Sequence, residues 1–383
     1  MFSNKVPLSW LNLMHNKRKL LLSILGVTFA VVIMFVEVGF YLTFFDKNTV
    51  LITKLNSDLI MVSKSKLSLI FTQRFSRTRL YQAASVDGVY AVHPLYIERA
   101  LSMWKNDNNQ TRSIRAIAFD ITQKIINIPQ IEKYKAQLAL PNTVLIDNKS
   151  RSCYGSKEVN TTTELANSHV QIVGDFTMGP DFSNHGNIIM SDKNFAILFQ
   201  KNAIDKLEGV SLGLIQIDPD YDIESVQKNL QKTLTDDVNI YTRDEYEQKE
   251  KDFWKVTSPV GPIFLMGTVA GFLVGIIICY QILYSNVMSY LKQFATVKAF
   301  GFANRYLLKV VLQEALLLSI FGFFVAFGAT RVIASIIAEH SSINITVDLY
   351  ISTIILILTV VMCVVAGIMA ARRAFLADPA DLF

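Results

Sequence analysis

The sequence predicts a membrane α-helical protein with four transmembrane helices and an α+β extracytoplasmic domain between the first and the second of them. Hydrophobic residues make up 51% of the chain, the mean hydropathy is +0.33, and only 18% of the residues are charged, whereas soluble globular chains average about 25%. The apolar residues gather into four long runs, and the 210 residues between the first two runs mix strand-like with helix-like patterns. Part of the chain must therefore lie in lipid.

The four apolar runs are residues 20–45, 260–284, 312–338 and 349–371. Each exceeds the roughly 20 residues that a spanning helix requires. The first run differs from a cleaved signal peptide, whose apolar core has only ~7–15 residues and ends at small residues. It is longer and leads directly into Phe44, Phe45 and Asp46. We therefore expect it to be a retained helix.

The distribution of basic residues predicts the orientation, because cytoplasmic flanks of membrane helices retain Lys and Arg. Ten such residues lie in three flanking segments: Lys5, Lys17, Arg18, Lys19, Lys292, Lys298, Arg305, Lys309, Arg372 and Arg373. Residues 46–255 carry 26 basic and 26 acidic residues and are neutral overall. We expect a multi-pass protein of the plasma (inner) membrane, with residues 1–19, 285–311 and 372–383 in the cytoplasm and residues 46–255 outside.

The first 19 residues contain Leu8, Leu11 and Met14 at helical spacing, with Trp10 beside them. This pattern predicts a short interfacial helix on the cytoplasmic leaflet, with the basic residues at 17–19 facing lipid phosphates. A simple positively charged flank explains the same residues equally well.

The domain at residues 46–255 combines strands with helices. Strand-like runs are Asp58–Val62, Val89–Ile97, Ile114–Phe119, Ile188–Met190 and Leu212–Ile217, and helix-like runs are Asp222–Leu234 and Arg243–Lys255. The middle of the domain, residues 141–180, is rich in Asn, Ser, Thr and Gly and predicts a small β-rich insertion. The charged run at 243–254 directly precedes the second span, so it is either a stalk helix that continues into the membrane or an ordinary linker helix.

Several kinds of site are missing from the sequence. The pattern G-x-x-x-x-G-K-[ST] of a phosphate-binding loop is absent, the five histidines lack the spacing of metal ligands, and no hydrolase motif occurs. The basic residues follow the membrane topology and do not indicate nucleic-acid binding. Cys153 stands alone in the domain, while Cys279 and Cys363 lie inside spans as small apolar residues. We expect no catalysis, no metal and no cofactor in this chain.

Two acidic residues, Glu37 and Glu314, lie within predicted spans. A charge at the centre of a membrane helix costs ~2.5–3.5 kcal/mol on insertion scales, so such residues usually face protein or water and often serve a function. Proton coupling is one interpretation. The other is structural, because Glu37 lies near the outer end of its span and Glu314 lies close in sequence to Lys309 and Arg305.

Gly267, Gly271 and Gly275 recur every four residues in the second span and form a smooth stripe. Small residues at this spacing let helices approach closely. We expect the stripe to mediate helix packing within the chain or across a homodimer.

The loop between the second and third spans mixes apolar and basic residues. Phe294, Val297 and Phe300 form an apolar ridge, and Lys292 and Lys298 form its rim. This composition favours a coupling element that contacts a partner protein, whereas a solvated turn would expose too many aromatic residues.

The same loop resembles that of a known family. The FtsX/MacB superfamily of permeases carries a pattern close to R-E-I-x-x-L-K-A-x-G. Here Lys292, Gln293 and Phe294 stand where Arg-Glu-Ile would be, and the run from Val297 to Gly301 keeps the pattern. Residues 16–27 resemble the N-terminal entry of the family, residues 377–383 its A-x-P-x-x-x-L tail, and residues 174–191 the DevC-type permeases of cyanobacterial exporters.

The resemblance implies a homodimeric, non-enzymatic permease with a MacB-like porter domain, whose loop residues Lys292, Gln293, Phe294, Val297, Lys298, Phe300 and Gly301 contact a separate ABC ATPase subunit. For DevC-type systems it further implies a periplasmic adaptor (membrane fusion) protein, an outer-membrane channel and a glycolipid or other amphipathic substrate. Two alternatives stay open: an FtsX-type regulator of a cell-wall hydrolase that transports nothing, and a lipoprotein-releasing permease.

Overall fold

The structure is a computed structural model that describes residues 16–200, 207–290, 304–341 and 348–375. The predicted interfacial helix at 1–19 lies almost entirely outside the described residues. The chain divides into two compact units. A helical unit contains the chain up to Thr43 and from Pro259 onward, and a sheet unit contains mainly Phe44–Ser258.

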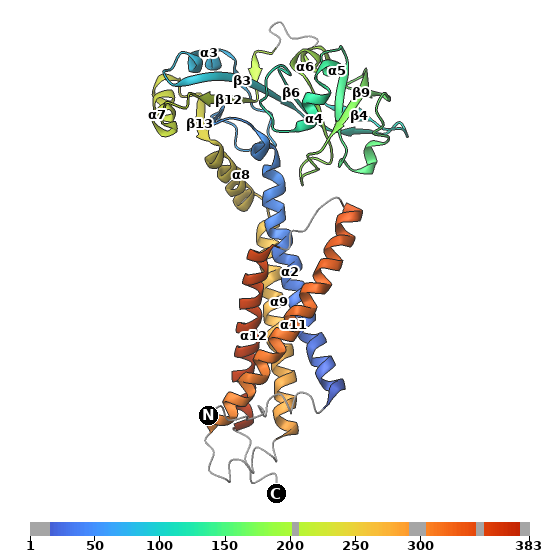
Figure 1. Cartoon of the computed structure of the whole chain (residues 1–383), viewed down its shortest axis with the longest axis vertical. Helices are drawn as coiled ribbons and strands as arrows, with labels where there is room; N and C mark the ends of the chain where they lie inside the picture. Colours follow the sequence, from blue (N-terminus) through green and yellow to red (C-terminus); the bar gives the residue numbers. More distant parts are fainter. Residues whose placement is uncertain (1–15, 201–206, 291–303, 342–347, 376–383) are drawn as a thin grey trace. The chain divides into compact units, whose positions relative to one another are not determined.

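The helical unit is built from four helices that are long and apolar enough to cross a membrane, so the chain is a multi-pass membrane protein. They are α2 (Lys17–Lys54), α9 (Val260–Ser289), α11 (Asn304–Ser341) and α12 (Leu349–Phe375) (Figure 1). All four include the apolar runs of the sequence. Helix α2 continues past the predicted end at residue 45 as far as Lys54, and its last turns belong to the sheet unit.

The core of the helical unit is apolar. Val27, Met34 and Phe35 of α2 are fully buried and pack in one cluster with side chains of α9, α11 and α12. The Sγ atoms of Cys279 in α9 and Cys363 in α12 are 3.6 Å apart. The two span cysteines are therefore buried neighbours, which their separation of 84 residues does not suggest.

The sheet unit contains one sheet of eleven strands in the order β13-β1-β12-β3-β6-β10-β7-β9-β8-β4-β5. The strands are β1 (Leu59–Ser63), β3 (Val89–Glu98), β4 (Met103–Lys105), β5 (Thr111–Ser113), β6 (Arg115–Phe119), β7 (Thr143–Asp147), β8 (Thr162–Leu165), β9 (Ser168–Phe176), β10 (Asn187–Ser191), β12 (Leu212–Ile217) and β13 (Val238–Thr242). Strands β2 (Phe75–Ser76) and β11 (Gly209–Val210) form a separate pair.

Most neighbouring strands are antiparallel, and two pairs are parallel. Strand β10 runs parallel to β6, with Asn187 opposite Arg115 and Ser191 opposite Phe119. Strand β7 runs parallel to β9, with Asp147 opposite Phe176. Strand β10 also pairs antiparallel with β7, with Ile188 opposite Ile146, so Arg115, Asp147 and Asn187 lie at the ends of adjacent strands.

Both faces of the sheet are buried, which explains why its central strands are continuous apolar runs. In β1, Leu59 and Met61 belong to the core on one face, and Ile60 and Val62 belong to the core on the other. The first face is covered by α3 (Thr78–Ala84), α6 (Asp192–Phe199) and α7 (Ile223–Thr233); the second by the end of α2 with α4 (Pro129–Lys133), α5 (Lys135–Leu138) and α8 (Arg243–Thr257).

The five strands and two helices predicted within this unit are confirmed to within a few residues. Residues 141–180 carry strands, as expected, but these strands differ from the small separate insertion that the sequence suggested. Strands β7, β8 and β9 pair with one another and with β10 and β4, so they continue the main sheet. Sequence composition could not reveal this continuity, because pairing depends on distant partners.

Candidate functional site

The seven predicted coupling residues, Lys292, Gln293, Phe294, Val297, Lys298, Phe300 and Gly301, lie outside the described residues. The structure describes the helices that flank them. Helix α9 ends at Ser289 and α11 begins at Asn304. The contacts near these two helix ends are described next.

Lys19, near the start of α2, links this helix to the end of α9. Its ammonium group donates to the carbonyl oxygen of Ser285 at 3.1 Å and to the hydroxyl of Ser289 at 3.0 Å. A cation beside the last carbonyl groups of a helix is stabilising, because the helix dipole places partial negative charge at that end. The sequence left two interpretations of the basic residues at 17–19 open, contact with lipid phosphates or a simple positively charged flank; Lys19 joins two helices.

Glu314 of α11 is buried, with 2% of its surface exposed, and it interacts electrostatically with Lys19. A cation from α2 thus acts on a buried carboxylate of α11. The sequence pointed to Arg305 and Lys309 because they are near in the chain. We call the set Lys19, Ser285, Ser289 and Glu314 the lysine joint; it links α2 with α9 and α11.

The glycine stripe of α9 packs against helices of the same chain. A Cβ atom built on Gly271 would lie 3.0 Å from Cγ2 of Ile33 in α2, and one built on Gly275 would overlap Sδ of Met362 in α12. Real Cβ contacts are almost never shorter than 3.0 Å. The absence of side chains at these positions is therefore what allows α2 and α12 to approach α9.

Glu37 lies against the third glycine of the stripe. A Cβ atom on Gly267 would be 2.5 Å from the carboxyl carbon of Glu37. One turn away, the rings of Phe40 and Phe264 stack with centroids 5.6 Å apart. The half-buried carboxylate has no hydrogen bond or ion pair within the described part of the chain. The glycine provides the space for this side chain, and a structural role of Glu37 is sufficient to account for its position.

In the sheet unit, a buried carboxylate fixes helix α8, which precedes α9 in the chain. Glu250 of α8 is 2% exposed and accepts hydrogen bonds from the hydroxyl of Ser68, from the backbone N–H of Leu69 at 3.0 Å and from Nε1 of Trp254 at 3.0 Å. Burial raises the pKa of Glu250, and these hydrogen bonds oppose the shift. The loop between β1 and β2 is thereby attached to α8.

A buried lysine lies in the same loop. Lys66 donates from Nζ to the carbonyl oxygens of Phe71 at 2.7 Å and Gln73 at 3.4 Å, and its own carbonyl accepts from Nζ of Lys249 at 3.0 Å. Burial lowers the pKa of Lys66 to about 8, although Glu250 acts in the opposite direction. We call Lys66, Ser68, Leu69, Glu250 and Trp254 the glutamate joint.

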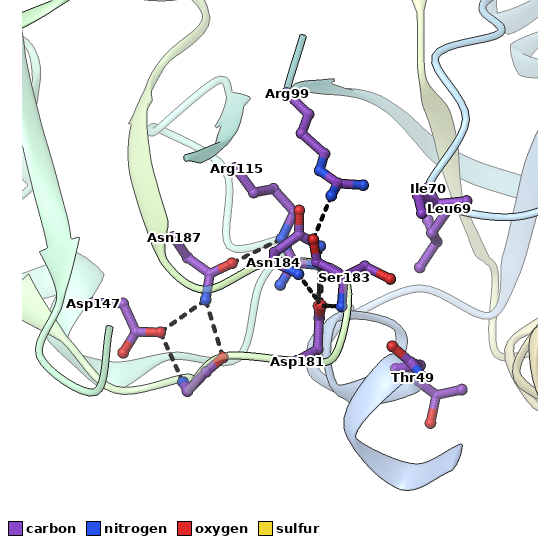
Figure 2. A network of polar contacts seen from close by, with 12 residues as sticks. Thr49, Leu69, Ile70, Arg99, Arg115, Asp147, Asp181, Ser183, Asn184 and Asn187 are labelled. Atoms are coloured by element: carbon purple, nitrogen blue, oxygen red, sulfur yellow. Dashed lines mark hydrogen bonds and ion pairs between the residues drawn. The ribbon is translucent and has the colours of Figure 1, made fainter. Parts of the chain in front are cut away.

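A second polar network lies at the ends of β6, β7 and β10 (Figure 2). Arg115 forms a buried ion pair with Asp181 at 2.6 Å and donates from Nε to Oδ1 of Asn187 at 2.8 Å. Asp147 accepts from Nδ2 of Asn187 at 2.8 Å and from the N–H of Gly179 at 2.7 Å. The network holds the turn after Gly179 against the sheet.

The described residues contain no cluster of three or more His, Cys, Asp and Glu side chains that could hold a metal ion. The hydrogen bonds of the two joints link a side chain of one element to the backbone or a side chain of another. Their geometry is that of connections between structural elements.

Residues 263–379 match the family model of the FtsX-like permease C-terminal domain. The matched segment includes α9 from Ile263 onward, α11, α12 and the segment between α9 and α11. It covers less than half of the chain and does not include the sheet unit. No curated protein matched the sequence.

Among solved structures, the chain is similar to the extracellular domain of the noncanonic ABC-type transporter YknZ from Gram-positive bacteria. The two share 12% sequence identity, and the alignment covers 49% of this chain and 100% of that chain, with a TM-score of 0.33. A TM-score at this level supports no argument about fold or function.

Sequence reasoning identified Glu37, Glu314 and the glycine stripe, but it did not identify the residues that they meet. It also missed both joints. Glu250 stands in a helix of charged residues and gives no sign of burial, and its partners Ser68 and Leu69 are more than 180 residues away. One signal in the sequence indicates that this loop packs against another element. Its residues 67–71 are mostly apolar, although the flanking residues Lys64, Lys66 and Arg74 are basic.

Proposed function

We propose that this chain is the permease subunit of an ABC-type exporter, which transmits the motion of a separate ATPase subunit to its sheet unit. The match of residues 263–379 to the FtsX-like permease C-terminal domain carries this proposal. The sequence lacks a phosphate-binding loop, so ATP hydrolysis is assigned to the partner. The segment 291–303, with its apolar ridge, is the proposed contact with the ATPase.

The lysine joint supports a role of this segment in coupling. Lys19, Ser285 and Glu314 connect three helices close to the two ends of the segment. A displacement of the segment would change the ends of α9 and α11 together and would pass to α2 through Lys19.

The glutamate joint supports transmission into the sheet unit. Only Ser258 and Pro259 separate the end of α8 at Thr257 from the start of α9 at Val260. Glu250 attaches α8 to the loop after β1, so a movement of α9 along its axis would act on that loop and on the edge of the sheet.

The proposed orientation places both termini in the cytoplasm of the plasma membrane and the sheet unit outside. It is supported by the ten basic residues in the flanks and by the neutral charge of residues 46–255. A reporter enzyme that is active only outside the cytoplasm tests this orientation when fused after Ser150 in one variant and after Phe383 in another. Activity of the second fusion alone would overturn it.

The finer assignment is a DevC-type exporter, in which the sheet unit meets a periplasmic adaptor and an outer-membrane channel and the substrate is a glycolipid or another amphipathic molecule. The resemblance of residues 174–191 supports it. A homodimer is part of the same proposal, although the glycine stripe does not support it, because its contacts lie within the chain.

Copurification of the ATPase with the tagged full chain tests the main proposal. Replacing both Phe294 and Phe300 with Ala removes the aromatic anchors of the ridge, and buried aromatic anchors commonly contribute ~2 kcal/mol or more each. The bound ATPase and the ATPase activity of the purified complex should fall sharply. Lys298→Glu should have a smaller effect, because a rim charge mainly alters the association rate.

Phe324→Ala is the matched control, since this aromatic residue of α11 is exposed and lies outside the segment. It should retain the ATPase. If no ATPase copurifies with the unmodified chain, or if the double variant binds it as well as the control does, the proposal is wrong.

A further inference from the structure

Three arginines and a histidine lie near the turn that follows Gly179 in the sheet unit. We define the basic cluster as Arg99, Arg112, Arg151 and His185. Hydrogen bonds to backbone carbonyl oxygens bring its members together. Nη2 of Arg99 donates to the carbonyl oxygen of Ser183, and the backbone N–H of Arg151 donates to the carbonyl oxygen of His185 at 3.0 Å. The hydroxyl of Ser113, next to Arg112 in the chain, donates to the carbonyl oxygen of Arg99 at 2.8 Å.

The positive charges of the cluster act on the same groups. Burial lowers the pKa of His185, and Arg151, Arg112 and Arg99 lower it further. The same three arginines oppose the rise that burial causes in the pKa of Tyr154, which reaches about 12. The charges of all three guanidinium groups thus act on both His185 and Tyr154. Such an arrangement of like charges is unfavourable unless an anion compensates it.

The chain supplies little compensation. Asp181 is the one carboxylate, within the described residues, that acts on both Arg99 and His185. Its oxygens are already engaged by the ion pair with Arg115 and by the N–H groups of Ser183 and Asn184 at 2.8 and 2.6 Å (Figure 2). Neither Arg112 nor Arg151 forms a salt bridge in the described part of the chain.

Two guanidinium nitrogens in this region are buried and have no hydrogen-bond partner among the described residues. They are Nη2 of Arg115 and Nε of Arg151. Arg115 is 5% exposed, and Figure 2 shows its guanidinium group beside the turn that Arg99 also contacts. A buried N–H group without a partner costs about 1–3 kcal/mol. The site therefore combines excess positive charge with unused donors.

The turn also lies close to the point where α2 enters the sheet unit. The ring of Phe182 packs on the ring of Phe44, with their centroids 4.7 Å apart. The centroids of the Phe44 and Trp254 rings are 5.6 Å apart. Phe44 is the first residue of the sheet unit after the apolar part of α2. Aromatic residues at the ends of membrane spans are typical of the lipid headgroup region.

We propose that the basic cluster, together with the free donors of Arg115 and Arg151, is a binding site for a phosphate group. Arginine recognises phosphate through paired N–H donors, and its planar group suits such an oxyanion better than lysine does. The phosphate belongs either to a lipid headgroup or to free inorganic phosphate. The site lies within the sheet unit and does not depend on the proposed function.

Isothermal titration of the full chain in a neutral detergent tests the proposal, with sodium phosphate as one probe and dihexanoyl phosphatidic acid as the other, at constant ionic strength. Arg112→Gln and Arg151→Gln each remove one cation without breaking a salt bridge in the described part of the chain. Each should weaken binding by about tenfold or more, as expected for the loss of a charge-assisted hydrogen bond. Arg77→Gln, which removes an equal charge outside the cluster, is the control and should bind normally.

Binding of both probes identifies a site for free phosphate, and binding of the lipid alone identifies a headgroup site. Both results support the proposal when the cluster variants weaken binding and the control does not. The proposal is wrong if neither probe binds at millimolar concentration, or if Arg77→Gln weakens binding as much as Arg112→Gln and Arg151→Gln do. Circular dichroism of each variant confirms that the comparison is made between folded proteins.

Discussion

The glutamate joint of the sheet unit and the lysine joint of the helical unit both fix a helix to another element, but they do so by different means. Glu250 is buried and receives three hydrogen bonds, one of them from the backbone. Lys19 is only half-buried and reaches a backbone carbonyl and a hydroxyl of α9. A buried ion with fixed partners makes a stiff connection, because losing any partner leaves an unsatisfied charge. A half-buried ion can exchange its partners for water at little cost.

The two units also differ in stiffness outside the joints. The sheet unit carries buried polar networks, such as that of Arg115 and Asp181, between strands whose hydrogen bonds already fix their register. The helical unit depends on close packing at glycines, as at Gly271 and Gly275. In a membrane, helices have no hydrophobic driving force to associate, so shape complementarity at small residues provides much of the specificity. The sheet unit is thus built for rigidity and the helical unit for close but adjustable contact.

Glu250→Ala should have the largest effect on stability. It leaves the donors of Leu69 and Trp254 without an acceptor and removes the carboxylate that interacts with the Lys66 ammonium. Each buried donor that is left without an acceptor costs about 1–3 kcal/mol. Urea unfolding of the full chain in detergent should show this loss, and hydrogen exchange should accelerate in the loop after β1.

Asp252→Ala is the control on the same helix, because Asp252 is exposed and forms a surface pair with Lys255. It should change stability by no more than about 1 kcal/mol. Equal losses in the two variants would mean that the glutamate joint is not stiffer than a surface ion pair.

Replacing glycines of the stripe should have the next largest effect. Gly275→Leu and Gly271→Leu place side chains where Met362 and Ile33 already lie, and overpacking of this kind costs about 1–3 kcal/mol. We expect a lower melting temperature for both variants, with the larger decrease for Gly275→Leu.

Gly328→Leu in α11 is the matched control, since a Cβ atom there would have nothing within 4 Å. All three changes replace glycine within a helix and gain similar helix propensity. If Gly328→Leu lowered the melting temperature as much as the stripe variants do, close packing at the stripe would not explain their effect.

The sequence predicted the fold elements well where one signal was strong. The four spans stand out because lipid demands about 20 consecutive apolar residues. Strands such as β1 and β12 stand out because burial on both faces requires continuous apolar runs. The extension of α2 beyond residue 45 was missed, because its buried apolar residues Leu51 and Ile52 stand among polar residues and do not raise the hydropathy enough.

The candidate sites were harder to predict, because their residues are distant in the chain. The basic cluster collects residues 99, 112, 151 and 185, none of which forms a motif with its neighbours. The lysine joint depends on a hydrogen bond between residues 19 and 285 and on the charge of residue 314. Spacing along one helix shows which residues share a face, but it does not show which side chain of another helix that face meets.

The pH dependence of stability provides a third test of the glutamate joint. The pKa of Lys66 is about 8 in the folded protein and near 10.5 when exposed. Between these values the unfolded chain binds more protons than the folded chain, so stability rises with pH across this window. The gain should be about 1 kcal/mol from pH 7 to pH 9.

Lys66→Met isolates this contribution, because other titrating groups affect both proteins. The difference in unfolding free energy between the two proteins should change by about 1 kcal/mol over the same interval. If this difference in unfolding free energy stayed constant from pH 7 to pH 9, Lys66 would have an ordinary pKa and its ammonium group would not be desolvated in the folded protein.

The smallest effect is expected at the lysine joint. Lys19→Gln removes the cation that contacts the end of α9 and interacts with Glu314. Because Lys19 is half-buried and water can replace its contacts, the loss should be about 0.5–1 kcal/mol. Lys17→Gln, which removes an exposed charge two residues earlier, should leave the melting temperature of the full chain nearly unchanged. A decrease for Lys19→Gln as large as that for Glu250→Ala would contradict the contrast between the two joints, because it would make the connection between α2 and α9 as stiff as that between α8 and the sheet.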